Sequence, residues 1–233
     1  MFNSKSSIKA IILDLDDTLY PEKAFIRSGF RAVSNYLSTK YNLSPTFIFK
    51  ILWEDFERGI RGKNFDLLLE RLGINDPSLC KKLVKIYREH FPDIQLDPRV
   101  KKTLEDLHSE FKLALLTDGH PTTQKNKIEA LGLRGYFDII KINDITKGED
   151  KTNIATLEKI VTRLKEIPSD IIFVGDNPLK DFAAPRYLGL HTVRIIIDDG
   201  LYSHIRGDYR QIDYTIYNLR EIYDVIEKIE GRE

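Results

Sequence analysis

Residues 10–19 read AIILDLDDTL, an apolar run followed by three acidic residues within four positions. An unbroken apolar run is typical of a strand that is buried on both faces of a parallel sheet. Acidic side chains at the carboxyl end of such a strand emerge where open α/β sheets bind their ligands. Because like charges this close together repel one another, the stretch predicts a bound divalent cation, and Mg²⁺ with carboxylate ligands fits best.

The length and composition of the chain favour a globular protein. The 233 residues are enough for one ordinary domain with a sizeable insertion, and 42% of them are hydrophobic. The 36 basic and 36 acidic residues cancel, so no overall field indicates nucleic acid or an anionic membrane as a partner. No apolar run reaches the roughly 18 residues that span a bilayer, and residues 1–9 lack the apolar core of a signal peptide. Together with a single cysteine, Cys80, this predicts a cytoplasmic protein.

The alternation of strand and helix stops directly after the first strand. From about residue 23 to 90 apolar residues recur at helical spacing, which predicts three or four consecutive helices. Turn-forming residues near 42–45, 59–62 and 73–77 separate them. Ser44 followed by Pro45 fits an N-cap with proline in the first helical turn. This segment is long enough to form a small bundle of its own.

The α/β rhythm resumes at Pro98 and continues to the end of the chain. Strands are expected at 113–116, 137–140, 171–174 and 192–197, with a short edge strand at 214–217. Helices are expected at 98–109, before Gly132, at 152–164, up to about 188, and at 218–229. Short connections between alternating strands and helices predict an α/β fold with a Rossmann-like doubly wound parallel sheet. Residues 1–20 and 97–233 would form this core, and residues 21–96 a helical cap over its carboxyl edge.

Three predicted strands change abruptly from apolar to polar residues at their carboxyl ends, which meet at one edge of a parallel sheet. In such a set one carboxylate can attack phosphorus, and a second can handle the proton of the alcohol. A hydroxyl and an ammonium group can hold the phosphoryl oxygens, and a metal ion offsets the charge. The set therefore predicts chemistry through a phosphorylated aspartate. The residues are Asp14, Asp16, Thr117, Asp118 and Asp176, with Lys151 in the loop before a helix.

The order of these residues resembles the four short motifs of the haloacid dehalogenase superfamily. The matching positions are the DLDDTL stretch at 14–19, Thr117, Lys151, and Gly175-Asp176 followed by Asp181. They cover the chain from about residue 8 to 197, each after an apolar strand or before a helix. The long insert between the first two motifs resembles the type 1 helical cap of subfamily I.

The resemblance implies a Mg²⁺-dependent phosphatase that hydrolyses a small phosphorylated metabolite. Asp14 would be the nucleophile that forms the aspartyl-phosphate, and Asp16 the general acid and base. Thr117, Asp118 and Lys151 would bind the phosphoryl group. The Mg²⁺ ligands would be Asp14, the backbone carbonyl of Asp16, and Asp176, with Asp181 and Asn177 in support.

Several alternatives stay open at this point. Lys147 competes with Lys151, because the family's usual proline after the lysine is replaced here by Thr152. Gly148, three residues before Lys151, favours Lys151. Asn177 can support the metal ion or cap the next helix. A phosphomutase acting on a sugar phosphate would use the same motifs, and a phospho-aspartate signalling module without turnover is an alternative of another class. The substrate is open, and the chain is expected to be a monomer or a homodimer.

Overall fold

The computed structural model describes residues 7–231, in which six strands form one parallel sheet in the order β3-β2-β1-β4-β5-β6. This is the strand order of doubly wound nucleotide-binding folds, so the predicted fold class is confirmed. Most of the polar segment 1–9 lies outside the described residues. The strands are β1 (Ala10–Leu13), β2 (Lys112–Gly119), β3 (Ile139–Asp144), β4 (Ile171–Gly175), β5 (His191–Ile195) and β6 (Tyr214–Ile216).

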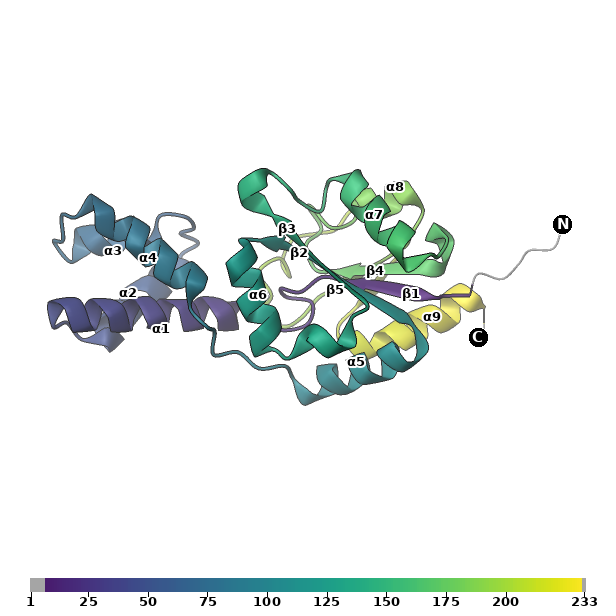
Figure 1. Ribbon diagram of the computed structural model, residues 1–233, viewed down its shortest axis with the longest axis horizontal. Coiled ribbons are helices and arrows are strands. Elements are labelled where there is room, and N and C mark those ends of the chain that lie inside the picture. Colours follow the sequence, from purple (N-terminus) through teal and green to yellow (C-terminus); the bar gives the residue numbers. More distant parts are fainter. Residues whose placement is uncertain (1–6, 232–233) are drawn as a thin grey trace.

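Helices cover both faces of the sheet, α5, α6 and α9 on one face and α7 and α8 on the other (Figure 1). Successive residues of β1 point to opposite faces: Ile11 and Leu13 belong to the first apolar cluster, and Ala10 and Ile12 to the second. All four are fully buried, as the unbroken apolar run predicts. The helices are α5 (Pro98–Glu110), α6 (Pro121–Ala130), α7 (Ile154–Leu164), α8 (Ala183–Leu188) and α9 (Ile222–Glu230).

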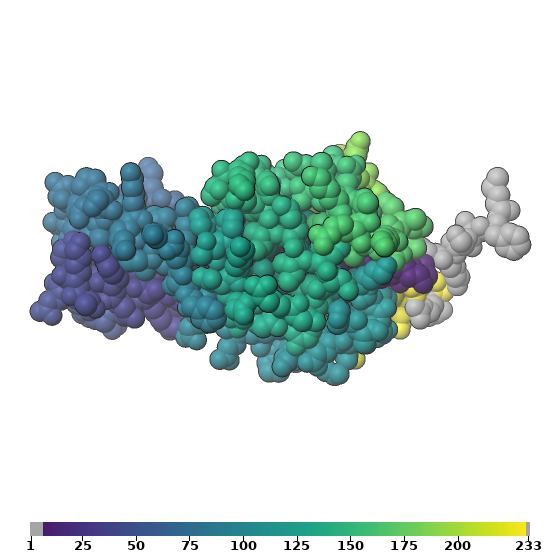
Figure 2. Space-filling view, viewed as in Figure 1, coloured from purple at the N-terminus to yellow at the C-terminus, as the bar shows by residue number. Residues whose placement is uncertain are grey.

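Four helices between β1 and α5 form what we call the helical insert, Glu22–Glu89. They are α1 (Glu22–Tyr41), α2 (Pro45–Glu57), α3 (Asn64–Arg71) and α4 (Pro77–Glu89). The Ser44 side chain caps α2 by accepting from the Phe47 backbone N–H, and Pro45 opens the first turn, as predicted. The insert lies beyond the carboxyl edge of the sheet and forms one end of the molecule (Figures 1 and 2).

Several predicted boundaries were wrong, among them the start of the last helix, which lies at Ile222 instead of residue 218 because residues 219–221 form a 3₁₀ turn. Two others also have a local reason. The third strand begins at Ile139 instead of Phe137, because residues 133–136 form a 3₁₀ turn that delays its entry into the sheet. Helix α7 begins at Ile154 instead of Thr152, because the Asn153 side chain accepts from the Ala155 N–H and acts as its N-cap. The expected edge strand is present as β6. Within residues 7–231, no helix has the length and apolar character needed to cross a membrane.

Candidate active site

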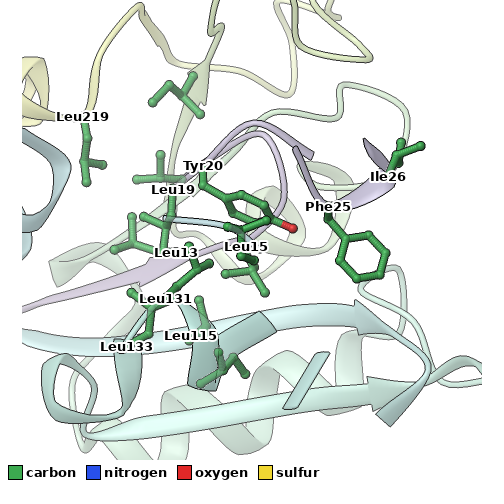
Figure 3. Packing of buried hydrophobic residues seen from close by; sticks show 14 of the residues in the cluster. Leu13, Leu15, Leu19, Tyr20, Phe25, Ile26, Leu115, Leu131, Leu133 and Leu219 are labelled. Carbon is green, nitrogen blue, oxygen red and sulfur yellow. The ribbon is translucent and has the colours of Figure 1, made fainter. Parts of the chain in front are cut away.

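The loop after β1 positions the first two acids. The Asp14 N–H donates to the Val174 carbonyl at 2.9 Å, which extends the pairing of β1 with β4 by one residue. Leu15 and Leu19 are buried beside Leu13 and hold the loop against the core (Figure 3). The carboxyl groups of Asp14 and Asp16 are thereby left at the carboxyl edge of the sheet.

A cavity of about 130 Å³ opens at this edge. The structure brings together there every residue that the sequence predicted for the site. Lys147, the competing lysine, is exposed instead and lies 3.6 Å from Asp144. The residues lining the cavity are Asp14, Asp16, Glu22, Thr117, Asp118, Lys151, Asp176, Asn177, Lys180, Asp181 and Tyr202.

Lys151 is buried between two of the acids. Its Nζ lies 2.6 Å from Asp14 Oδ1 and 3.1 Å from Asp181 Oδ1. The backbone N–H of Lys151 donates to Asp118 Oδ2 at 3.1 Å, and Asp118 Oδ1 accepts from Asn143 Nδ2 at 2.8 Å. Asp118 therefore holds the lysine loop with its carboxylate. Burial acts to lower the pKa of Lys151, but the ion pairs with Asp14 and Asp181 outweigh it and raise the pKa, so the lysine keeps its charge.

Asp14, Asp176 and Asp181 form a buried cluster in which one oxygen of each carboxylate lies within 4.8 Å of the others. Burial raises the pKa of Asp14 to about 7, although the Lys151 charge opposes the rise. Burial and the Asp14 charge raise the pKa of Asp176 to about 9. A single ammonium group thus balances three buried carboxylates, and oxygen ligands in this arrangement suit a hard divalent cation.

Gly175 and Gly119 allow side chains to approach the ends of β4 and β2 closely. A Cβ on Gly175 would lie 2.5 Å from Asp181 Oδ2, and one on Gly119 would lie 2.8 Å from the Gln124 side chain. The Asp181 carboxylate can therefore reach the end of β4, where it also accepts from the Asn177 N–H at 2.9 Å. Asn177 Oδ1 accepts from the Leu179 N–H at 3.0 Å, which stabilises the turn before α8. The alternative of a helix cap is wrong, because the N-cap residue of α8 is Phe182.

Asp16 is held by three residues that the sequence reasoning missed. Lys127 Nζ lies 2.7 and 2.9 Å from its two carboxylate oxygens. The Tyr20 hydroxyl donates to Asp16 at 2.5 Å, and Gln124 Nε2 donates to it at 3.1 Å. Gln124 also donates to Thr117 Oγ1 at 2.5 Å, which links the second strand end to this network.

The electrostatic balance at Asp16 differs from that at Asp14. Burial acts to raise the pKa of Asp16, but the Lys127 charge and the hydrogen bonds outweigh it, so the pKa is lowered. The missed signal was helical spacing. Gln124 and Lys127 fall on the same face of α6 as Ile128 and Leu131, so polar side chains interrupt the apolar face.

Comparison with known proteins identifies the family. The sequence profile of the haloacid dehalogenase-like hydrolases matches residues 8–189, well over half of the chain. The chain belongs to the haloacid dehalogenase-like hydrolases. The predicted family and the prediction of an enzyme are confirmed, and a hydrolase family favours an enzyme over the signalling module.

Named relatives agree with the family assignment, and a similar solved structure agrees with the fold. The glyceraldehyde 3-phosphate phosphatase of Methanocaldococcus jannaschii is 30% identical, and the match covers 95% of this chain and 98% of that protein. The protein of the same name from Methanopyrus kandleri is also 30% identical, with the same coverage. A magnesium-bound HAD hydrolase from Bacillus subtilis has a TM-score of 0.65 at 19% identity, covering 94% of this chain and 99% of that one.

Proposed function

We propose that this hydrolase is a Mg²⁺-dependent phosphatase that acts on a small phosphomonoester through an aspartyl-phosphate on Asp14. The observation that carries the proposal is the position of Asp14. Its carboxylate lies 2.6 Å from the buried ammonium group of Lys151 and in one cluster with those of Asp176 and Asp181. Asp16 lines the same cavity, two residues further along the chain. A nucleophile, a proton donor and cationic groups thus converge where a phosphoryl group would bind.

The proposed reaction has two steps. Asp14 attacks phosphorus while Asp16, in its protonated form, gives its proton to the departing alcohol oxygen; the bond from phosphorus to that oxygen breaks and the phosphoryl group moves to Asp14. Asp16 then accepts a proton from a water molecule that attacks the aspartyl-phosphate, and inorganic phosphate leaves. Lys151 and the Thr117 hydroxyl, together with the backbone N–H of Asp118, hold the phosphoryl oxygens during both steps.

The metal site is the acid cluster described above. Asp14, Asp176 and Asp181 would hold Mg²⁺ with their carboxylates, and Asp16 would add its backbone carbonyl. When bound, Mg²⁺ supplies positive charge that offsets the carboxylates and the phosphoryl oxygens. Asn177 supports this site by holding Asp181 through its backbone N–H.

The names of the relatives indicate where to look for the substrate. Glyceraldehyde 3-phosphate, which the relatives from M. jannaschii and M. kandleri are named for, is the first ester to test. The helical insert lies over the catalytic edge and would act as the cap that encloses it, with residues 1–20 and 97–233 as the core. A cytoplasmic location and a monomeric or dimeric state stay predictions.

The test is phosphate release from a panel of phosphomonoesters with and without Mg²⁺. We expect turnover by the wild type only with the metal, and a loss of about 10³-fold or more in Asp14→Asn. Lys147→Met is the matched control for Lys151→Met, since Lys147 is exposed. Only the Lys151 variant should lose activity. Metal-independent turnover by Asp14→Asn would contradict the mechanism, and isomerisation of a sugar phosphate without phosphate release would indicate a mutase.

A further inference from the structure

Glu22 is a cavity-lining acid that the proposed reaction does not use. It is the first residue of α1 and lines the same cavity as Asp14 and Asp16. Its backbone N–H donates to Asp17 Oδ1 at 2.7 Å, which fixes its position at the start of the insert. Its carboxyl group has no hydrogen-bond partner among residues 7–231. A side chain held at the cavity wall with unused hydrogen-bonding capacity is suited to contact a ligand.

The cations near Glu22 are already committed to other acids. Lys127 pairs with Asp16, and Lys151 pairs with Asp14 and Asp181. Lys180 also lines the cavity, from an exposed position. Among residues 7–231, the lining of the cavity therefore has no unpaired buried cation with which to receive a second anionic group of the substrate.

The electrostatic environment of Glu22 also disfavours a second anionic group of the substrate. Burial raises the pKa of Glu22 to about 8, and the negative charges of Asp16, Asp17 and Asp14 add to the rise, while Lys127 opposes it. Because the buried lysines are already paired with other acids, a carboxylate or a second phosphate of the substrate would meet the Glu22 carboxyl group without a buried cation to offset it. Neutral hydroxyl and carbonyl groups carry no such penalty, and a carboxyl group can hydrogen-bond to either.

The volume of the cavity limits the size of the alcohol. At about 130 Å³ it is well below the lower bound of about 300 Å³ for pockets that hold drug-sized ligands. With the phosphoryl group placed at Asp14 and Lys151, a short chain fills the rest of the cavity. Tyr202 lines the remaining wall of the same cavity.

We propose that Glu22 selects the alcohol part of the substrate, by hydrogen-bonding a hydroxyl or carbonyl oxygen of a short, uncharged, hydroxylated leaving group. This inference rests on the proposed phosphatase function and adds the substrate class to it. Phosphorylated three- and four-carbon polyols and hydroxyaldehydes fit the site, and phosphorylated carboxylic acids and bisphosphates do not.

The experiment compares matched esters on the full-length chain with Mg²⁺. Glycerol 3-phosphate and propyl phosphate share a carbon skeleton, but only the first carries hydroxyl groups. Glyceraldehyde 3-phosphate and 3-phosphoglycerate differ only in an aldehyde against a carboxylate. We expect the wild-type kcat/KM to be about tenfold or more higher for the aldehyde than for the carboxylate. Glu22→Ala should lower kcat/KM for glycerol 3-phosphate about tenfold and leave propyl phosphate within about twofold.

Glu22→Gln and Glu70→Gln complete the design. Glu22→Gln keeps hydrogen-bonding groups and should retain the preference for glycerol 3-phosphate over propyl phosphate. Glu70 is an exposed acid of the same insert, and Glu70→Gln should change no ratio. Equal losses on both three-carbon esters in Glu22→Ala, or no loss on either, would overturn the role of Glu22 while the phosphatase proposal stands. Absence of phosphate release from every ester by the wild type would overturn both.

Discussion

At the scale of single residues, the buried carboxylates of the active site predict how stability depends on pH. The pKa of Asp176 is raised to about 9 and that of Asp14 to about 7, both from 3.8. Between pH 3.8 and these raised pKa values, the folded chain binds more protons than the unfolded chain. The free energy of unfolding therefore falls as pH rises. Without metal, we expect the midpoint of thermal unfolding to fall between about pH 5 and pH 9 because of these two groups.

Mg²⁺ supplies the control for this prediction. A bound cation takes the place of the protons, so saturating Mg²⁺ should raise the midpoint most at high pH and flatten the pH dependence. In Asp176→Asn the metal-free dependence should also be shallower, since the most strongly shifted carboxyl is gone. An identical slope in Asp176→Asn and the wild type would show that the acid cluster is not its source.

Lys127 carries the second prediction at this scale. Its ammonium group holds both oxygens of Asp16, the proposed general acid and base, and lies 4.2 Å over the Phe25 ring. Lys127→Met should lower kcat about 10²-fold, because Asp16 loses the ammonium group that orients both of its carboxylate oxygens. Steady-state kinetics with Mg²⁺ would measure this effect. Lys125→Met, at an exposed position of the same helix, should leave kcat unchanged. An unchanged kcat in Lys127→Met would refute the role.

The residues of the site differ in how well the sequence predicts them. Asp14, Thr117 and Asp176 each follow an apolar run, so strand ends in a parallel sheet suffice to bring them together. Gln124 and Lys127 lie inside a helix, and their role depends on how α6 packs beside the β1 loop. Helical spacing marks both as polar groups on the buried face of α6, but the residue that they contact there is set by tertiary packing, which no local pattern encodes.

At the scale of elements, Asp17 joins three segments. It adopts a left-handed conformation, with φ +51°, which places its carboxylate at the start of α1. Oδ1 accepts from the Glu22 N–H and Oδ2 from the Leu201 N–H, both at 2.7 Å. Helix α1 has no side-chain cap at its own N-cap residue, Pro21, so Asp17 satisfies one of its free N–H groups. Asp17 thereby fixes α1 and the loop after β5 against the β1 loop.

Asp17→Ala should therefore destabilise the fold by about 2–4 kcal/mol, since two partly buried N–H groups lose a charged acceptor, at a left-handed position that Asp tolerates better than Ala. Asp17→Asn, which tolerates this backbone conformation and keeps one acceptor oxygen, should cost about half as much. Urea unfolding followed by circular dichroism measures both. Asp199 has φ +62° but is exposed, so Asp199→Asn is a matched control with a cost below about 1 kcal/mol. Equal costs at the two positions would contradict the bridging role.

Element boundaries were predictable where neighbouring residues form a recognisable cap or helix break. Ser44 and Pro45 marked the start of α2 correctly. The start of β3 was predicted two residues early, because the aromatic Phe137 stands directly before the strand but still belongs to the end of the 3₁₀ turn at 133–136. Short apolar runs of this kind do not distinguish a tight turn from a strand.

At the scale of the whole molecule, the insert and the core meet at a polar junction between α4 and α6. Asn126 Nδ2 donates to the carbonyls of Glu89 and His90 at 3.0 and 3.1 Å, and Thr123 Oγ1 donates to the Arg88 carbonyl at 2.8 Å. Figure 1 shows that α4 leads directly from the insert back to the core. Because α6 also carries Lys127, the helix that anchors the insert is the one that positions Asp16.

Asn126→Ala should therefore change kcat and KM together, by a few-fold each, because loosening this junction alters both how the insert covers the cavity and how α6 holds Asp16. The stability cost should be only about 1 kcal/mol, since the freed carbonyls at the end of α4 can bind water. Asn35→Ala, at an exposed position of α1, is the matched control and should change neither constant. If Asn126→Ala lowers the unfolding midpoint but leaves kcat and KM unchanged, the junction is a structural contact alone, and the insert does not act on catalysis through α6.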